Sequence, residues 1–156
     1  RGIFIENYRL DQLMKNLKLK DSFCQENQVI SSKNVFRGFH FQNPPHEQSK
    51  LIRVSKGKIL DFVVDINKKS KNYGKYAQFE LSDKNNRILY VPRGYAHGYL
   101  VIEDETIVIY NVDNYYNKES EGGILYNDTK ININWPISIN DLIISRKDKN
   151  FKRFNW

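Results

Sequence analysis

The sequence predicts an all-β protein, an antiparallel sandwich or barrel with only short peripheral helices. Eight or more short segments rich in β-branched and aromatic residues follow one another, with turn signals about every 8–12 residues. The 156 residues suit one domain with a real core, and ten Tyr and nine Phe favour strands and a cavity lined with rings. Double-sheet jelly rolls, cupins among them, use this pattern and can hold a small ligand between their sheets.

The first 31 residues contain three predicted elements. Residues 1–8 alternate in character and are expected to form a strand. The apolar residues of 10–17 recur at i, i+3, i+4 and i+7, which predicts a short amphipathic helix packed on the core. Residues 23–31 carry three amides within four positions, at 25, 27 and 28. This stretch is either a polar edge strand or a segment that hydrogen-bonds a polar ligand.

Residues 36–54 form the most informative stretch. Phe39 and Phe41 alternate with His40, so a strand here directs the histidine to one face and both rings to the other. A Pro-Pro turn follows, and a second strand begins at Lys50. With the apolar run after it, this strand is expected to form a hairpin turning at Gly57.

The remainder of the chain continues as short strands. A charged loop over 67–74 and a polar loop over 114–123 interrupt them. The expected strands cover 77–82, 87–92, 95–102 and 106–112.

Charge and cysteine content limit the class of protein. The formal charge of +7 has two interpretations. It can serve solubility and a general attraction to anions, or it can serve the binding of a substrate that carries phosphates. Nucleic acid is not the expected partner, because the lysines are scattered and no Arg-rich helix or aromatic RNA-binding motif is present. One cysteine allows no internal disulfide, no apolar run reaches 18 residues and no signal peptide is visible. We therefore expect a cytoplasmic protein with no membrane partner.

The best candidate for chemistry is His40. Arg37 precedes it by three residues and Lys50 follows it by ten, which brings a base and two cations together on a β scaffold. Metal-binding cupins usually present an HxH pair, and this pair is absent here, so no metal site is expected. Taken alone, a strand histidine is more often structural, Tyr110 would be a core tyrosine and Asp148 a surface charge. The residues by themselves indicate a β-barrel with a basic pocket that contains histidine.

Several motifs together resemble those of the dTDP-4-dehydrorhamnose 3,5-epimerase family. They occur in the family's order and cover almost the whole chain. They include RGIFIENY, CQENQVISSKNVFRGFHFQ, QSKLIRV, LYVPRGYAHGYLV, IVIYNVDNYY, SEGGILYND, INWP and ISRKD. The family pattern usually has one more strand before RGIF. We therefore expect residues 1–156 to form a single jelly-roll domain that lacks this upstream strand.

The resemblance implies a homodimeric, cofactor-independent epimerase acting on a nucleotide-diphosphate 4-keto-6-deoxy sugar, a hexose or a heptose. The C4 ketone acidifies the hydrogens on C3 and C5, because the resulting carbanion delocalises into an enolate. A base removes a proton from one face, and an acid returns one to the other.

The resemblance also assigns the catalytic residues. His40 matches the family's base, and an ordinary imidazole is largely unprotonated at neutral pH. Asp148 matches its carboxylate partner, which fixes the tautomer and stabilises the imidazolium. Tyr110 matches the acid on the opposite face, and Lys50 the cation that stabilises the enolate oxygen.

Further positions match the family's binding residues. Arg1 and Glu6 match nucleotide contacts that can come from the neighbouring subunit. Arg37 matches a sugar or pyrophosphate contact, for which a planar guanidinium is well suited. The other substrate-binding candidates are Gln25, Asn27, Lys50, His97, Tyr116, Glu121 and Lys147, with Tyr115 beside them.

Two other functions remain open at this point. A related cupin isomerase would move the keto group between C4 and C3, and a non-catalytic module would only bind a sugar nucleotide. The loop with His46 and Glu47 and the basic tail after Asp148 depart from the family's usual pattern. The nucleotide base, the sugar size and the inverted centres, C3, C5 or both, therefore stay open.

Overall fold

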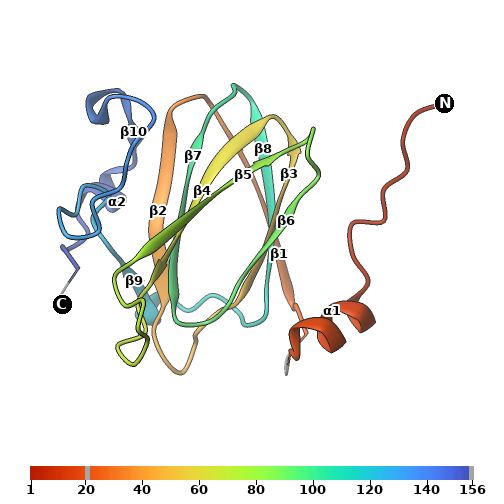
Figure 1. The fold of residues 1–156 in the computed structure, drawn as a ribbon, viewed down its shortest axis with the longest axis horizontal. Helices are drawn as coiled ribbons and strands as arrows, with labels where there is room; N and C mark the ends of the chain where they lie inside the picture. The colour runs from red at the N-terminus through yellow and green to blue at the C-terminus, as the bar shows by residue number, and fades with distance from the viewer. Residues whose placement is uncertain (20–21, 155–156) are drawn as a thin grey trace.

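Two β-sheets packed face to face make up the body of the molecule (Figure 1). The computed structural model describes residues 1–19 and 22–154. The first sheet has the order β1-β8-β3-β6. Its strands are β1 Gln25–Ser31, β8 Thr106–Val112, β3 Lys50–Lys56 and β6 Ile88–Val91. The prediction that residues 23–31 hold an edge strand is confirmed, because β1 lies at the border of this sheet.

The second sheet has the order β10-β2-β7-β4-β5, and β9 pairs with β2 outside this path. All its pairs are antiparallel except the two-residue pair of β10 with β2. Its strands are β2 Val35–Gln42, β4 Lys58–Asp65, β5 Tyr76–Ser82, β7 Tyr95–Val101, β9 Glu121–Gly123 and β10 Ile143–Ile144. The predicted all-β, cupin-like antiparallel jelly roll with short helices is confirmed.

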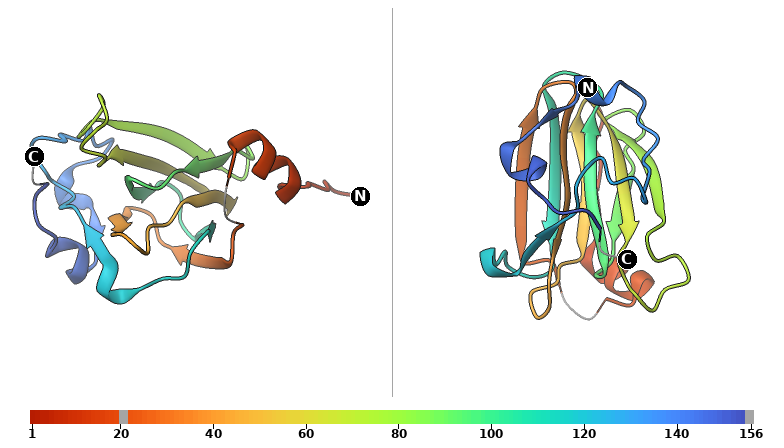
Figure 2. Two further views of the ribbon diagram at one scale, coloured as in Figure 1. Left: turned by 90° about the horizontal axis from the view of Figure 1, so that it is seen from below. Right: turned by 90° about the vertical axis from the view of Figure 1, so that its left-hand side faces the viewer.

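Alternation along the strands divides the apolar residues between two clusters. On β7, Ala96 and Leu100 face outward, where the C-terminal segment covers the second sheet (Figure 2). Tyr99 and Val101 face inward and pack between the sheets with residues of β3, β4 and β8. Since His97 has the same parity as Tyr99, its side chain also points to the interior, where it is buried.

The predicted hairpin around Gly57 is wrong. β3 pairs with β6 and β8 in the first sheet, whereas β4 pairs with β5 and β7 in the second. At Gly57 (φ +81°) the chain crosses from one sheet to the other, and a Cβ there would collide with Thr106. A glycine turn has the same local signature at a hairpin and at such a corner, and only the distant partner strands distinguish the two.

The predicted N-terminal strand is also wrong for this chain. The helix α1 Leu10–Leu17 forms as expected, but residues 1–9 contain no strand. They extend away from the sandwich, with Ile3 89% and Phe4 94% exposed (Figure 1). A strand needs a neighbour for its backbone hydrogen bonds, and no other segment within residues 1–19 and 22–154 pairs with this one. The apolar stripe of α1 was expected in the core, yet no residue of the helix is buried.

The C-terminal segment after β9 packs against the second sheet (Figure 2). It contains the 3-10 helix η2 Ile139–Asp141 and the helix α2 Arg146–Lys149, and η1 Lys118–Ser120 lies just before β9. None of the described helices is long and apolar enough to cross a membrane. The segment brings α2 against β2, which positions the residues discussed next.

Candidate active site

A cavity in two connected parts lies between the sheets. The outer part has a volume of about 370 Å³ and the inner part about 150 Å³. His40, Lys50 and Tyr110 line both parts, so these three side chains stand where the two parts meet. The inner part is completed by Val29, Arg37, His97 and Tyr99. The outer part is completed by Gln25, Asn27, Phe41, Gln42, Gln48, Val112, Tyr116, Glu121 and Lys147.

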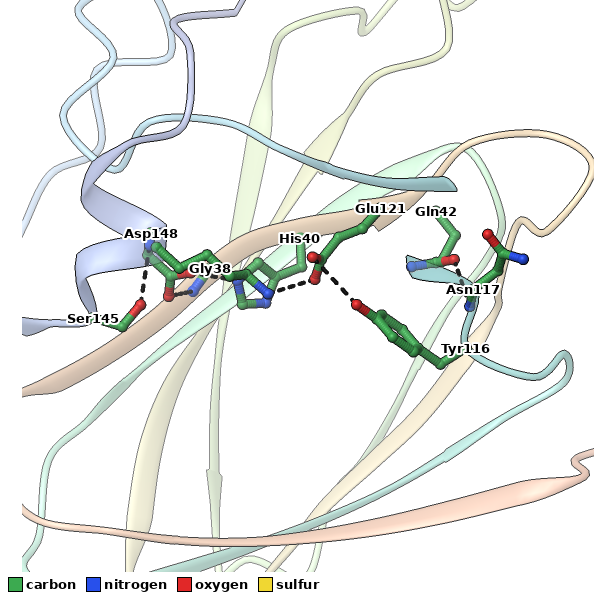
Figure 3. A network of polar contacts seen from close by, with 9 residues as sticks. Gly38, His40, Gln42, Tyr116, Asn117, Glu121, Ser145 and Asp148 are labelled. Atoms are coloured by element: carbon green, nitrogen blue, oxygen red, sulfur yellow. Dashed lines mark hydrogen bonds and ion pairs between the residues drawn. The ribbon is translucent and has the colours of Figure 1, made fainter. Parts of the chain in front are cut away.

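His40 and Asp148 form a hydrogen-bonded pair at this junction (Figure 3). His40 Nε2 lies 2.8 Å from Asp148 Oδ1, and the backbone N–H of Gly38 donates to Asp148 Oδ2 at 3.3 Å. The Ser145 hydroxyl caps α2 by accepting from the backbone N–H of Asp148 at 3.0 Å. Burial alone would raise the pKa of Asp148, but the hydrogen bond and charge of His40 outweigh it and hold that pKa below its usual value. A carboxylate in this position orients the imidazole and leaves Nδ1 for a substrate.

A β-bulge explains why Arg37 shares this cavity with His40. Residues three apart in a regular strand point to opposite faces. The pairing of β2 with β7 shifts register between Arg37 and His40, which returns both side chains to the cavity side. The Arg37 guanidinium is held in place by donating from Nε to the Ser31 hydroxyl at 3.1 Å.

The ring of Phe151 packs edge-on against the His40 imidazole, with ring centroids 5.6 Å apart.

Tyr110 and Lys50 face His40 from the other sheet. Tyr110 lies on β8 and Lys50 on β3, both in the first sheet, whereas His40 lies on β2 in the second. Burial raises the pKa of Tyr110, so its hydroxyl keeps its proton at neutral pH. Burial lowers the pKa of Lys50 to about 8, and the charges of Asp61 and Glu121 oppose this. A sugar ring held between the sheets would have a base on one side and a proton donor on the other.

A second histidine–carboxylate pair, His97 with Asp61, lies near Lys50 at the inner part of the cavity. His97 Nε2 is 2.8 Å from Asp61 Oδ2, and both side chains are buried. Burial raises the pKa of Asp61 and lowers that of His97, while each partner partly offsets the shift of the other. We did not predict Asp61 from the sequence. The available signal was a lone carboxylate at an inward position of an apolar strand, between Ile59 and Val63.

Glu121 organises the mouth of the cavity (Figure 3). Its Oε1 accepts from Lys147 Nζ at 2.6 Å, and its Oε2 accepts from the Tyr116 hydroxyl at 3.4 Å. On β1, Gln25 Nε2 donates to Asn27 Oδ1 at 3.0 Å. The side-chain oxygen Oε1 of Gln25 also accepts from the backbone N–H of Tyr116 at 3.4 Å. The opening is therefore surrounded by two side-chain amides, the phenol of Tyr116 and the long cationic side chain of Lys147.

Three residues singled out in the sequence do not reach this cavity in the single chain. Arg1 and Glu6 lie on the exposed segment that extends from the sandwich (Figure 2). Tyr115 is 67% exposed and does not line the cavity. The structure adds lining residues that the sequence interpretation passed over, among them Gln48 and Tyr99.

The arrangement suits proton transfer on a substrate with an acidic C–H bond. It provides a carboxylate-bound imidazole, a protonated phenol from the opposite sheet and a partly buried ammonium group. Throughout residues 1–19 and 22–154, no three His, Cys, Asp or Glu side chains are grouped so that they could hold a metal ion.

Comparison with known proteins agrees with this geometry. The family pattern described as dTDP-4-dehydrorhamnose 3,5-epimerase matches residues 1–155. The chain is 40% identical over 154 residues to the dTDP-4-dehydrorhamnose 3,5-epimerase of Shigella flexneri, covering 99% of this chain and 84% of that protein. It is 41% identical to the enzyme of the same name from Methanothermobacter thermautotrophicus, covering 97% of this chain and 82% of that protein.

Solved structures give the same result. A crystal structure of dTDP-4-dehydrorhamnose 3,5-epimerase from Elizabethkingia anophelis superposes with a TM-score of 0.93 at 40% identity, covering 97% of this chain and 82% of that one. A Legionella pneumophila 3,5-epimerase in complex with dTDP-4-keto-L-rhamnose superposes with a TM-score of 0.92 at 34% identity, covering 97% and 80% of the two chains. This chain therefore belongs to the dTDP-4-dehydrorhamnose 3,5-epimerase family.

Proposed function

We propose that this protein is a cofactor-independent epimerase that inverts C3, C5 or both in a nucleotide-linked 4-keto-6-deoxy sugar. The observation that carries the proposal is the pairing of His40, on the second sheet, with Asp148 of α2, opposite Tyr110 on the first sheet. Base and acid then approach the two faces of one ring, as inversion requires. The family membership and the keto-sugar complex of the Legionella relative support the substrate class.

The mechanism follows from the roles of four side chains. His40 Nδ1 removes the proton next to the ketone, the C–H electrons become the enolate, and Asp148 stabilises the imidazolium that forms. Lys50, as an ammonium, stabilises the enolate oxygen. The Tyr110 hydroxyl then donates a proton to the opposite face of the same carbon. Solvent restores both groups to their starting protonation states.

The outer part of the cavity is assigned to the nucleotide diphosphate. Gln25, Asn27 and Tyr116 offer amides and a ring for the base, and Lys147 offers a cation for the phosphates. In the inner part, Arg37 and His97 contact the sugar side of the pyrophosphate link or the ring itself. Glu121 holds Lys147 and Tyr116 in position for these contacts.

The functional unit is a homodimer in which Arg1 and Glu6 serve the partner's cavity. The segment that carries them has no partner strand in the described part of its own chain, and its Ile3 and Phe4 side chains are almost fully exposed. Such a segment gains backbone hydrogen bonds and apolar contacts by packing on a second copy of the chain. We place the reaction in the cytoplasm, where the single thiol of Cys24 stays reduced.

Deuterium wash-in tests the proposal. The protein is incubated in deuterated water with dTDP- and GDP-linked 4-keto-6-deoxy sugars, hexoses and heptoses, and C3 and C5 are followed by NMR. We expect deuterium at one or both carbons together with the inverted product. His40→Asn should lower the rate by about 10²–10⁴-fold, whereas His46→Asn, outside the cavity lining, should stay within about threefold.

The same experiment distinguishes the competing functions. A keto group found at C3 in the product would indicate an isomerase. Tight binding with no exchange at either carbon on any of these sugars would indicate a binding module and refute the proposed function.

A further inference from the structure

Tyr99 has a buried hydroxyl group with no partner, and its side chain lines the inner part of the cavity. The residue is only 4% exposed, and within the described part of the chain no group hydrogen-bonds its Oη atom. Its ring belongs to the interior cluster between the sheets, and the side chain lines the inner cavity beside Tyr110 and His97. A buried hydroxyl without a partner costs folding free energy that a phenylalanine in the same place would not cost.

The charged neighbours of Tyr99 do not bond its hydroxyl. Across the strand pairs, Tyr99 lies opposite Arg37 on β2 and opposite Asp61 on β4. Arg37 Nε donates to Ser31, and Asp61 Oδ2 is bonded to His97, while Asp61 Oδ1 has no partner among the described residues. Two charged side chains of opposite sign thus flank the phenol, and the structure shows neither bonded to Oη. Within the described part of the chain, no group therefore satisfies this hydroxyl.

The size and lining of the inner cavity indicate which part of a ligand arrives there. A volume of about 150 Å³ has room for a sugar ring but not for a base, a ribose and two phosphates together. His40, Lys50 and Tyr110 line the same space, so any group that meets Tyr99 belongs to the ring on which they act. Burial raises the pKa of Tyr99, so the hydroxyl stays protonated and can donate.

We propose that Tyr99 is a specificity residue whose hydroxyl hydrogen-bonds an oxygen substituent of the keto-sugar ring. This inference rests on the proposed function and extends it. A cavity that offers a buried hydroxyl discriminates against a ring lacking the matching oxygen, because the protein group then stays unpaired. Tyr99 therefore selects among keto sugars by their oxygenation, while the chemistry remains with His40, Lys50 and Tyr110.

Tyr99→Phe tests this, because it removes one oxygen atom and keeps the ring. The matched control is Tyr95→Phe, on the same strand but outside both parts of the cavity. Four quantities are measured for each protein: the melting temperature, the Kd for dTDP, the Kd for a dTDP-4-keto-6-deoxy sugar, and the wash-in kcat/KM. For Tyr99→Phe we expect a melting temperature equal to or above that of the wild type, dTDP affinity within about twofold, and kcat/KM lower by about 10- to 100-fold. Tyr95→Phe should leave kcat/KM and both Kd values within about twofold.

Substrate analogues complete the test. Each ring hydroxyl is removed in turn from the sugar nucleotide. For the analogue that lacks the partner of Tyr99, wild type and Tyr99→Phe should bind within about twofold of each other. Equal kcat/KM of the two proteins on the complete substrate would overturn the inference, as would an equal loss of affinity for dTDP and for the sugar nucleotide.

Failure of the proposed function gives a different result. If wild type exchanges neither C3 nor C5, the epimerase proposal fails. The inference for Tyr99 is then decided by binding alone: it survives if Tyr99→Phe reduces the affinity gain of the sugar nucleotide over dTDP, and it fails if that gain is unchanged.

Discussion

The bond between His40 and Asp148 allows a quantitative prediction for Asp148→Asn. The substitution keeps the side-chain volume and removes the negative charge that lies 2.8 Å from His40 Nε2. When His40 takes the substrate proton, the imidazolium loses its counter-charge. Two unit charges about 4 Å apart interact by about 4 kcal/mol at an effective dielectric constant of about 20. That energy corresponds to a rate loss of about 10³-fold.

An asparagine also weakens control over the tautomer of the imidazole. The carboxylate can only accept, so it holds the proton on Nε2 and leaves Nδ1 free to act as base. The amide can instead donate to Nε2, which moves the ring proton to Nδ1. This effect adds to the electrostatic loss, so we expect a fall in wash-in kcat of about 10³–10⁴-fold.

The assay is the wash-in rate at C3 and C5 under saturating substrate, with thermal melting and dTDP binding as controls for folding and for the nucleotide site. Asp141→Asn is the matched control, because it makes the same change on an exposed residue of the C-terminal segment. It should leave the rate within about twofold. A loss of less than about tenfold in Asp148→Asn, with melting and dTDP binding intact, would refute the assigned role of the pair.

Two further predictions concern the residues on the opposite sheet. Tyr110→Phe removes the acid but not the base, so deuterium wash-in should continue with retained configuration while the inverted product falls by about 100-fold or more; undiminished inversion would show that another group is the acid. Lys50 has a pKa lowered to about 8 by burial, so its cationic form, and with it wash-in activity, should decline as the pH rises through about 8. Lys50→Arg, which stays charged, should remove that decline, whereas Lys50→Met should be slow at every pH; an alkaline limb that persists in Lys50→Arg would assign the titration to another group.

Much of the fold follows from local patterns. Alternation along the chain predicted the strands that became β1 to β8, and the spacing from Leu10 to Leu17 predicted α1. These features depend on neighbours within a few residues, and the pleat of a strand or the turn of a helix converts that spacing directly into faces. The same alternation directed His40 away from the rings of Phe39 and Phe41.

The remaining features depend on which distant segments meet. The turn at Gly57 is a corner between the two sheets, because the strands on either side of it pair elsewhere. β3 pairs with β8 in the first sheet, and β4 pairs with β7 in the second. Residues 1–8 have the alternation of a strand, but no strand among the residues that the structure describes pairs with them. A local pattern states what a segment can form, and backbone pairing decides whether it does.

The sequence by itself determined the succession of strands along the chain, their inward and outward faces and, through its motifs, the residues to which chemistry is assigned. Only the tertiary structure brought His40 to Asp148 across 108 residues and His97 to Asp61 across 36. The bulge in β2 that admits Arg37 to the cavity and the unpartnered hydroxyl of Tyr99 likewise appear only there. These features come from the packing of two sheets, which joins residues far apart in the chain, and neither spacing nor composition encodes that packing locally.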